Sequence, residues 1–181
     1  MEFIKTDFEG LYLIKPAVFK DNRGFFMEFY AKEKFADAGI DACFVQDNHS
    51  KSMSVGVVRG LHFQDPPFSQ AKLVRVTKGA VYDVVVDLRK NSPTFGKWTG
   101  FELTEENFMM MFIPRGFAHG FCTLVPDTEF QYKVDNPYSA AHDRGIRWDD
   151  SDIGVNWPVS EPVISKKDSN LPYLREIVSP F

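Results

Sequence analysis

Residues 72–88, KLVRVTKGAVYDVVVDL, contain two runs rich in β-branched residues, separated by a turn-forming glycine. Alternate residues of a strand point to the same face of a sheet. One face of these runs therefore combines valines with charged residues, namely Lys72, Val74 and Val76, then Val81, Asp83, Val85 and Asp87. In the first run, the opposite face carries Leu73 and Arg75. This mixture favours a barrel with a polar-lined mouth, or one covered by a second chain, over a free sheet. Alternatively, the charges extend into solvent at strand ends.

Similar strand-like runs lie on both sides of this segment. They cover residues 11–19, 24–30, 43–50, 54–63, 98–103, 108–113, 119–124 and 129–134. Helix formers that end at Gly39 predict one helix over residues 31–39, and a second short helix is expected after Lys167. Short strands with turn-rich spacing predict an all-β sandwich or barrel, built as a single domain over residues 1–181.

Composition restricts the class of protein further. The net charge of -4 gives no general attraction for nucleic acid or an anionic membrane, so neither is expected as a partner. The two cysteines, Cys43 and Cys122, have neither the spacing of a zinc site nor that of a disulfide framework. The opening residues lack a long apolar core, and no apolar run is long enough to span a membrane. We therefore expect a cytoplasmic protein.

Several polar residues interrupt the strand-like runs. Judged alone, each is more commonly a hydrogen-bonded structural residue than a functional one. Burying so many ionisable groups in one small barrel is costly, however, unless they pair with one another or with a ligand. The set consists of Arg23, Glu28, Gln46, Asn48, Arg59, His62, Lys72, Asp83, His119 and Tyr132.

The histidines raise the question of a metal site. In VVRGLHFQDP (residues 57–66), a metal-binding cupin barrel often has a second histidine two residues after His62, but this chain has Gln64. Lys72 then follows where a metal site would benefit from a carboxylate, and His119 in PRGFAHGF would leave only two histidines. Catalytic zinc commonly has three protein ligands. We therefore expect neither a metal nor another cofactor.

Acid–base chemistry is the alternative. Neutral imidazole is an effective general base near pH 7, which suits His62. Lys72, Arg59 and His119 are candidates to stabilise a developing oxyanion, and Tyr132 is a candidate proton donor. This combination fits proton movement next to a carbonyl, as in isomerisation, epimerisation or elimination, but it does not identify the substrate.

The chain resembles the dTDP-4-dehydrorhamnose 3,5-epimerase family along essentially its whole length. The matching segments are RGFFMEFY (23–30), FVQDNHS (44–50), VVRGLHFQ (57–64), KLVRVTKGAVYDVVVDLRKNSPTFGKW (72–98), FIPRGFAHGF (112–121) and RGIRWDD (144–150). The resemblance implies a metal-free, cupin-like jelly-roll β-barrel with a few short peripheral helices. It also implies a homodimer in which an N-terminal segment crosses to the partner subunit. The implied reaction converts dTDP-4-dehydro-6-deoxy-D-glucose to dTDP-4-dehydro-L-rhamnose, a step towards dTDP-L-rhamnose.

The resemblance also implies roles for individual residues. His62 corresponds to the base that removes protons beside the ketone, and Asp168 to the carboxylate that orients it. Tyr132 corresponds to the acid on the opposite face, and Lys72 to the cation that stabilises the enolate. Tyr138 corresponds to the tyrosine that stacks on thymine. The residues implied to contact substrate are Arg23, Glu28, Gln46, Asn48, Arg59, His119, Asp143 and Lys167, where Asp143 replaces the glutamate usual in the family.

Three alternatives stay open at this point. Related enzymes that epimerise only one of the two carbons keep the same histidine and tyrosine. A catalytically silent cupin would bind the nucleotide or sugar without proton exchange, although such a protein would be expected to have lost some of His62, Lys72, Tyr132 and Asp168. A metal-dependent oxygenase is the least favoured, because the metal ligands are incomplete.

Overall fold

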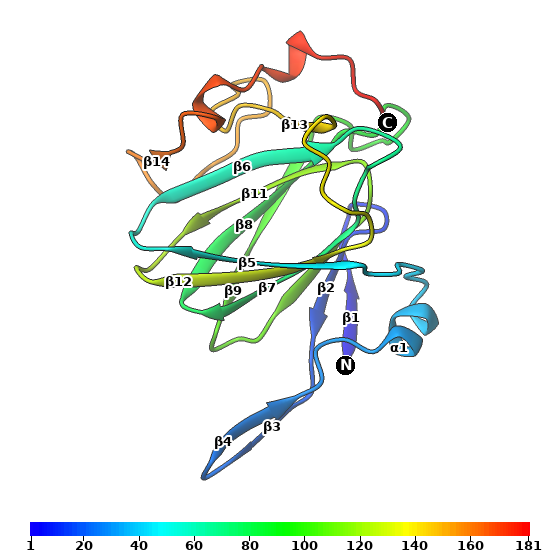
Figure 1. The fold of residues 1–181 in the computed structure, drawn as a ribbon, viewed down its shortest axis with the longest axis vertical. Helices are drawn as coiled ribbons and strands as arrows, with labels where there is room; N and C mark the ends of the chain where they lie inside the picture. The colour runs from blue at the N-terminus through cyan, green and yellow to red at the C-terminus, as the bar shows by residue number, and fades with distance from the viewer.

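The computed structural model describes all 181 residues and consists of two sheets packed face to face with a projecting hairpin (Figure 1). The first sheet has the order β1 (Glu2–Lys5), β2 (Tyr12–Lys15), β10 (Met110–Ile113), β7 (Lys72–Lys78), β12 (Thr128–Val134) and β5 (Gln46–Ser52). The second has the order β13 (Asp143–Gly145), β6 (Val57–Gln64), β11 (Phe117–Thr123), β8 (Ala80–Asp87) and β9 (Trp98–Thr104), with β14 (Val163–Ile164) parallel to β6. This architecture is the predicted cupin-like jelly roll.

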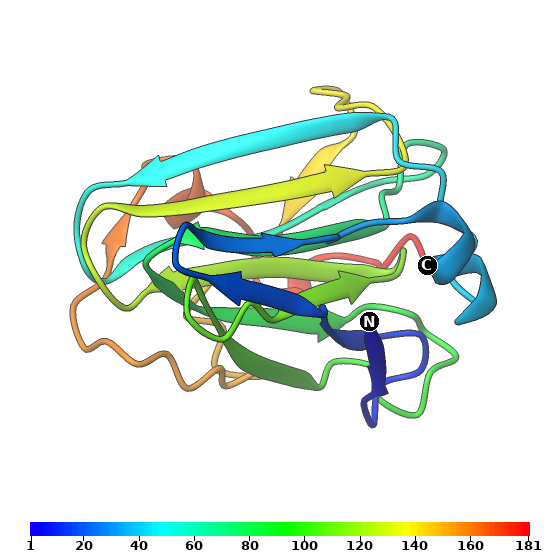
Figure 2. The same ribbon diagram turned by 90° about the horizontal axis from the view of Figure 1, so that it is seen from below.

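The remaining elements are small. The hairpin of β3 (Val18–Asp21) and β4 (Gly24–Met27) extends away from the two sheets (Figure 1). Helix α1 (Lys32–Asp37) follows it, and two 3₁₀ turns, η1 (Asp168–Asn170) and η2 (Leu174–Glu176), lie near the C-terminus. Seen from below, cyan β5 runs beside yellow-green β12 at one edge of the first sheet, and dark-blue β1 lies at the other (Figure 2). No helix in the chain is long and apolar enough to cross a membrane.

The valines that the alternation in residues 72–88 puts on one face are buried together. Val74 and Val76 of β7 and Val81 and Val85 of β8 belong to one buried cluster between the two sheets. Phe121 and Phe130 stack in the same cluster, with ring centroids 4.4 Å apart. Burial of these side chains between the sheets is the main source of stability, at about 25 cal/mol for each Å² of apolar surface removed from water.

The outer faces of both sheets are also covered within the chain. A cluster that includes Val84 and Val86 of β8, and Leu88 just after it, packs against the C-terminal residues, among them Ile146 and Ile153. On the other sheet, Leu73 and Met110 belong to a cluster with Phe35 of α1. The apolar residues on the outer faces of the central strands are therefore buried by the chain's own peripheral segments.

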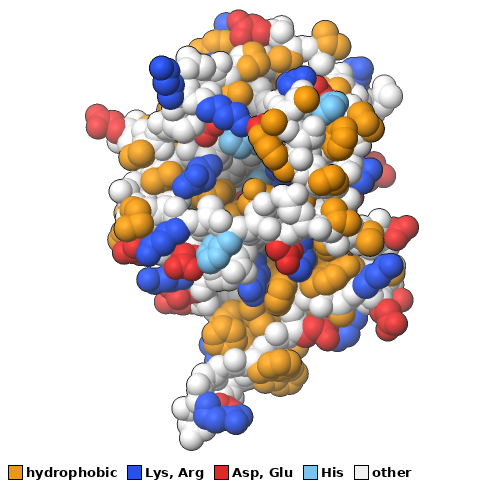
Figure 3. All heavy atoms as spheres, viewed as in Figure 1, with side chains coloured by type: hydrophobic (Ala, Val, Ile, Leu, Met, Phe, Trp, Pro, Cys, Tyr) orange, Lys and Arg blue, Asp and Glu red, His pale blue; other side chains and the backbone are white.

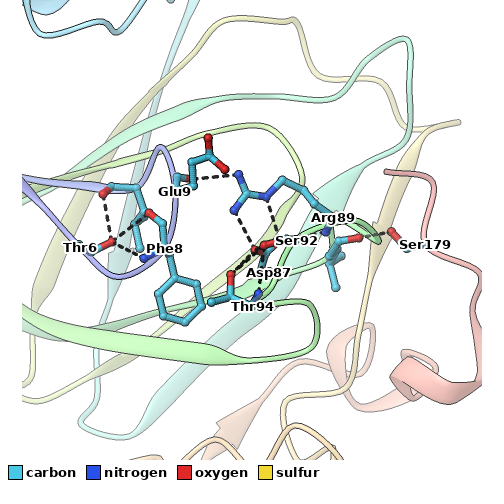
Figure 4. A network of polar contacts seen from close by, with 10 residues as sticks. Thr6, Phe8, Glu9, Asp87, Arg89, Ser92, Thr94 and Ser179 are labelled. Carbon is cyan, nitrogen blue, oxygen red and sulfur yellow. Dashed lines mark hydrogen bonds and ion pairs between the residues drawn. The ribbon is translucent and has the colours of Figure 1, made fainter.

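A polar network joins the N-terminal loop to the end of β8 (Figure 4). The buried Asp87 carboxylate accepts hydrogen bonds from Arg89 Nε (2.9 Å), Ser92 Oγ (2.6 Å) and Thr94 Oγ1 (2.7 Å). Arg89 also donates to the backbone oxygen of Glu9 at 2.9 Å. Burial opposes ionisation, but these donors hold the pKa of Asp87 below its usual value. Asp87 is thus a structural carboxylate with every oxygen partnered.

Some predicted boundaries were wrong. The strand expected over residues 11–19 is divided in two at Pro16, which has no N–H to donate. The strand expected over residues 24–30 ends at Met27, where the hairpin ends. Helix α1 ends before Gly39, whose φ of +82° is left-handed, as predicted for its stop. Strands β1, β13 and β14 were not predicted.

Candidate active site

A cavity of about 560 Å³ opens between the two sheets, lined by β6 and β11 on one side and by β7 and β12 on the other. In the space-filling view, the face seen in Figure 1 is hollowed, with histidine side chains inside the hollow and cationic side chains around it (Figure 3). The cavity is lined by all four residues expected to be catalytic, His62, Lys72, Tyr132 and Asp168. Arg59, His119 and Lys167 also line it.

His62 and Asp168 form a close pair. His62 Nε2 lies 2.7 Å from Asp168 Oδ1, and the backbone N–H of Gly60 donates to Asp168 Oδ2 at 3.4 Å. Burial opposes ionisation of Asp168, but the hydrogen bond and charge of His62, with Gly60 and Ser165, hold its pKa below the usual value. Because Nε2 is bonded to the carboxylate, Nδ1 is the ring nitrogen left to accept a proton. The His62 side chain keeps 30% of its surface exposed, so a substrate can reach it.

A second histidine–aspartate pair lies deeper. His119 Nε2 is 2.7 Å from Asp83 Oδ1, and both side chains are buried. Asp83 Oδ2 has no hydrogen-bond partner, which is costly for a buried carboxylate. Burial raises the pKa of Asp83, although His119 and Lys72 oppose this, and burial lowers the pKa of His119. A neutral imidazole is therefore favoured at His119.

Lys72 is the buried cation of the site. Burial lowers its pKa to about 8, and the negative charges of Asp83 and Asp143 work in the opposite direction. The ammonium form is therefore present below pH 8 and is lost above it. A cation held in a place with little water interacts more strongly with a developing oxyanion than it would in bulk solvent.

Tyr132 lies on the other side of the cavity from His62. Tyr132 comes from β12 of the first sheet, whereas His62 comes from β6 of the second. Burial raises the pKa of the Tyr132 hydroxyl, with Arg59 acting against this, so the phenol is protonated at neutral pH. The structure thus provides a proton acceptor and a proton donor on opposite sheets, facing one cavity.

Another polar group gathers at the loop that joins β12 to β13. The Tyr138 hydroxyl donates to Asp143 Oδ2 at 3.1 Å, and Lys167 forms an ion pair with the same oxygen. The hydrogen bond and charge of Asp143 raise the pKa of Lys167. Gln46 Oε1 accepts the backbone N–H of Tyr138 at 3.0 Å, and Gln46 Nε2 donates to Asn48 Oδ1 at 2.8 Å. The Tyr138 side chain is largely exposed beside these groups.

Two of the expected contact residues lie elsewhere in this chain. Arg23 is on the β3–β4 hairpin, where it pairs with Asp21 at 2.6 Å and keeps 85% of its side-chain surface exposed. Glu28 follows the hairpin and pairs with Lys34 at 2.6 Å. Neither lines the cavity. The other expected residues either line the cavity or, as for Gln46, Asn48, Tyr138 and Asp143, are linked to its Lys167 by hydrogen bonds.

Some features of the site were not predicted from the sequence. Asp83 interrupts a run of valines in the sequence, but its partner His119 is distant along the chain, and no local pattern indicates the pair. Phe121 and Phe130 line the cavity and belong to the core as well, which their sequence positions do not reveal. No group of three or more histidine, cysteine, aspartate or glutamate side chains is placed to hold a metal ion.

Fold and site together define a cupin-like jelly-roll protein with an acid–base site between its sheets. A family model described as dTDP-4-dehydrorhamnose 3,5-epimerase matches residues 5–176, and the chain belongs to this family. A relative of that name from Shigella flexneri is 52% identical over 171 residues, which cover 94% of each chain. The predicted resemblance is confirmed.

Solved structures agree with this assignment. The epimerase of Bacillus anthracis with TDP and PPi bound has a TM-score of 0.94 and 50% identity, covering 96% of this chain and 99% of that one. The enzyme of Legionella pneumophila in complex with dTDP-4-keto-L-rhamnose has a TM-score of 0.93 and 41% identity, covering 97% and 94%. A more distant relative, named dTDP-4-dehydrorhamnose 3-epimerase, from Streptomyces niveus is 38% identical over 93% of this chain and 81% of its own length.

Proposed function

We propose that this protein epimerises dTDP-4-dehydro-6-deoxy-D-glucose at carbons 3 and 5 to give dTDP-4-dehydro-L-rhamnose, in the biosynthesis of dTDP-L-rhamnose. The observation that carries the proposal is the arrangement of His62 and Tyr132 on opposite sheets of one cavity. Inversion of a carbon requires that its proton leave from one face and return to the other. Similarity to named epimerases supports this choice of substrate.

In the proposed mechanism, His62 takes the proton from the carbon beside the ketone, and Asp168 stabilises the imidazolium that forms. The electron pair of the C–H bond moves onto the ketone, whose oxygen becomes an enolate stabilised by Lys72. Tyr132 then donates its proton to the carbon from the opposite face. Exchange with solvent returns His62 and Tyr132 to their starting states, and the sequence repeats at the second carbon.

The nucleotide is proposed to lie along the polar end of the cavity. Tyr138 stacks on thymine, a contact worth about 1–3 kcal/mol. Arg59 suits the diphosphate because its guanidinium donates two parallel hydrogen bonds. His119 is proposed to contact the sugar. The further proposed contacts are those of Arg23, Glu28, Gln46, Asn48, Asp143 and Lys167.

We also propose that the protein is a homodimer whose N-terminal hairpin crosses to the partner subunit. Phe19, Phe25 and Phe26 on this hairpin are 66%, 57% and 70% exposed, which is unusual for side chains of this size. Arg23 lies at the turn of the same hairpin, away from its own cavity. Delivery of Arg23 and Glu28 to the partner's cavity would bury the aromatic rings and complete both sites.

Mixing two defective variants tests the shared site. Arg23→Ala chains retain His62, and His62→Ala chains retain Arg23, so a mixed dimer has one complete site if the hairpin crosses. Random exchange should then recover about a quarter of the wild-type activity, because half the dimers are mixed and each has one working site. No recovery after proven subunit exchange would show that Arg23 serves its own chain.

Solvent exchange tests the reaction itself. The protein is incubated with dTDP-4-dehydro-6-deoxyglucose in deuterated water, and the sugar protons are followed by NMR with a coupled reductase in parallel. Deuterium at both carbons beside the ketone, with rhamnose formed on reduction, is the expected result. Deuterium at only one carbon would establish the mono-epimerase alternative. Binding without exchange would make the protein a silent binder.

The Tyr132→Phe variant separates proton removal from inversion. We expect it to exchange substrate protons but to form little inverted sugar. Inversion at the wild-type rate would assign the acid to another residue or to water.

The reaction is proposed to occur in the cytoplasm, where the free thiols of Cys43 and Cys122 stay reduced.

A further inference from the structure

Gln64, the residue that occupies the place of a second cupin histidine, is buried and fully hydrogen-bonded. Its Nε2 donates to the backbone oxygen of Phe68 at 2.7 Å and to that of Pro137 at 3.2 Å. Its Oε1 accepts the backbone N–H of Ser139 at 2.7 Å. A carboxamide provides two donors and an acceptor, and all three contacts here are to backbone groups of two loops.

These contacts lie on both sides of Tyr138. The peptide group between Pro137 and Tyr138 is held by its oxygen, which bonds Gln64, and by its N–H, which bonds Gln46 Oε1 at 3.0 Å. The next peptide group is held by the Ser139 N–H, again through Gln64. The φ and ψ angles of Tyr138 describe the relative rotation of these two planar groups. Fixing both planes to one buried side chain therefore fixes the backbone of Tyr138 and the direction of its Cα–Cβ bond.

The loop depends on such side-chain contacts because it has little regular backbone pairing. Residues 135–142 lie between β12 and β13 and form no strand or helix. Asn136 Nδ2 donates to the oxygens of Pro67 and Ser69, and Gln70 Nε2 donates to the oxygen of Asn136 at 2.8 Å. These amides join the same two loops, but Gln64 is the one that brackets Tyr138.

We propose that Gln64 is a positioning residue that presents the Tyr138 ring for stacking on the base and so sets the affinity for the nucleotide without taking part in proton transfer. The inference rests on the proposed function, which places thymine on Tyr138. An exposed aromatic side chain loses binding energy when its backbone can rotate, because ordering it then has an entropic cost. The Gln64 carboxamide removes that cost before the ligand arrives.

Substitution of Gln64 by methionine tests this role, since methionine has a similar length and no hydrogen-bonding amide. We expect Gln64→Met to raise the dissociation constant for dTDP, measured by calorimetry, at least about tenfold. Turnover at saturating substrate should stay within about threefold of wild type, because the reacting end of the cavity is unchanged. If Gln64→Met does not fold, as judged by its melting curve, Gln64→Glu replaces it, since glutamate keeps the acceptor and loses both donors.

Gln70→Met is the matched control. It removes an amide contact between the same two loops but leaves both peptide groups beside Tyr138 in place. We expect its dissociation constant for dTDP to stay within about twofold of wild type. An equal loss of affinity in Gln64→Met and Gln70→Met would mean that general loosening of the loops, and not the fixing of Tyr138, explains the effect.

A double-mutant cycle with Tyr138→Ala gives the decisive comparison. If Gln64 acts through Tyr138, Gln64→Met should cost little further affinity in the Tyr138→Ala background, so the two effects are strongly non-additive. Additive effects, or unchanged dTDP affinity in Gln64→Met, would overturn the inference. Wild-type protein that binds dTDP without sugar exchange would overturn the proposed function alone, whereas failure to bind dTDP at all would overturn both.

Discussion

The two histidine–aspartate pairs of the cavity share the same Nε2–Oδ1 distance, 2.7 Å, but lie in opposite surroundings. In the first pair, the His62 side chain is 30% exposed, and Asp168 has a further backbone donor and a lowered pKa. In the second, His119 is 7% exposed, and Asp83 has one oxygen without a partner and a raised pKa.

This difference separates two kinds of chemistry. The first pair is arranged to take up a proton, because the carboxylate that would face the imidazolium is already stabilised as an anion. The second pair is poor at taking up a proton, since burial disfavours the charged imidazole. Instead, Asp83 supplies negative charge close to Lys72 and helps to keep its ammonium form. In the proposed mechanism, the His62–Asp168 pair therefore transfers protons, and the more buried His119–Asp83 pair influences the charge of Lys72.

Glutamine substitutions of the two histidines should show the largest difference. A glutamine amide can take the place of Nε2 as donor to each aspartate, but it cannot accept a proton. His62→Gln should lower the solvent-exchange rate by about 10²–10⁴-fold, the usual contribution of a general base. His119→Gln should lower it by no more than about tenfold. If both variants lost the same factor in exchange rate in the NMR assay, the proposed difference in role between the two pairs would be wrong.

Asp168→Asn should have the next largest effect. The amide can donate to Nε2 and so favour the wrong tautomer, and it no longer stabilises the imidazolium. We expect the rate to fall by about 10²–10³-fold, with the dissociation constant for dTDP unchanged. A loss of less than tenfold would mean that Asp168 is needed only to hold its loop, and calorimetry with dTDP serves as the control for folding.

The pH dependence of turnover should depend on the deeper pair. Lys72 has a pKa of about 8, so its ammonium form, and with it the rate, should decline as the pH rises through 8. Asp83→Asn removes one of the anions that raise this pKa, the other being Asp143, and should move the alkaline limb about one unit lower. A rate profile from pH 6 to 10 measures both. If the alkaline limb of Asp83→Asn stayed at the wild-type pH, Asp83 would not be raising the pKa of Lys72.

The smallest expected effect is on the free energy of unfolding, which substitution of the two aspartates should change in opposite directions. The pKa of Asp168 is lowered on folding, so its ionised form stabilises the native state above the unfolded pKa near 4, and this stability is lost as the pH falls. The pKa of Asp83 is raised, so its ionisation costs stability over that upper range. At pH 7, Asp168→Asn should lower the free energy of unfolding by about 1–2 kcal/mol, and Asp83→Asn should raise it by about 1 kcal/mol. Denaturant titration measures both changes in the free energy of unfolding. Changes of the same sign would contradict the proposed difference between Asp168 and Asp83.

The sequence predicted the fold well where local patterning determines it. The alternation in residues 72–88 predicted which valines share a face, and Gly39 predicted the end of α1. Strands β1, β13 and β14 were missed because they are four residues or fewer, and β13 and β14 also depend on pairing with β6, which is distant in sequence. No local signal indicates such pairing.

The resemblance implied the site residues and one contact among them, that of Asp168 with His62, which the structure shows; the other contacts were not predicted. The Asp83–His119 pair joins β8 to β11, and the contacts of Gln64 join two loops that are more than 60 residues apart. A sequence pattern shows that a polar residue interrupts an apolar strand, but it does not show which distant group satisfies it. For that reason the sequence alone indicates only that Gln64 is not a metal ligand.

Phe121 and Phe130 both hold the two sheets together and line the cavity. His62 and Lys72 come from opposite sheets, so the thickness of this aromatic layer sets their separation. A substitution selected for tighter packing would therefore change the spacing between a base and a cation. In this architecture, evolution towards greater heat resistance and evolution towards a faster reaction act on the same methylene groups and rings, and each constrains how far the other can proceed.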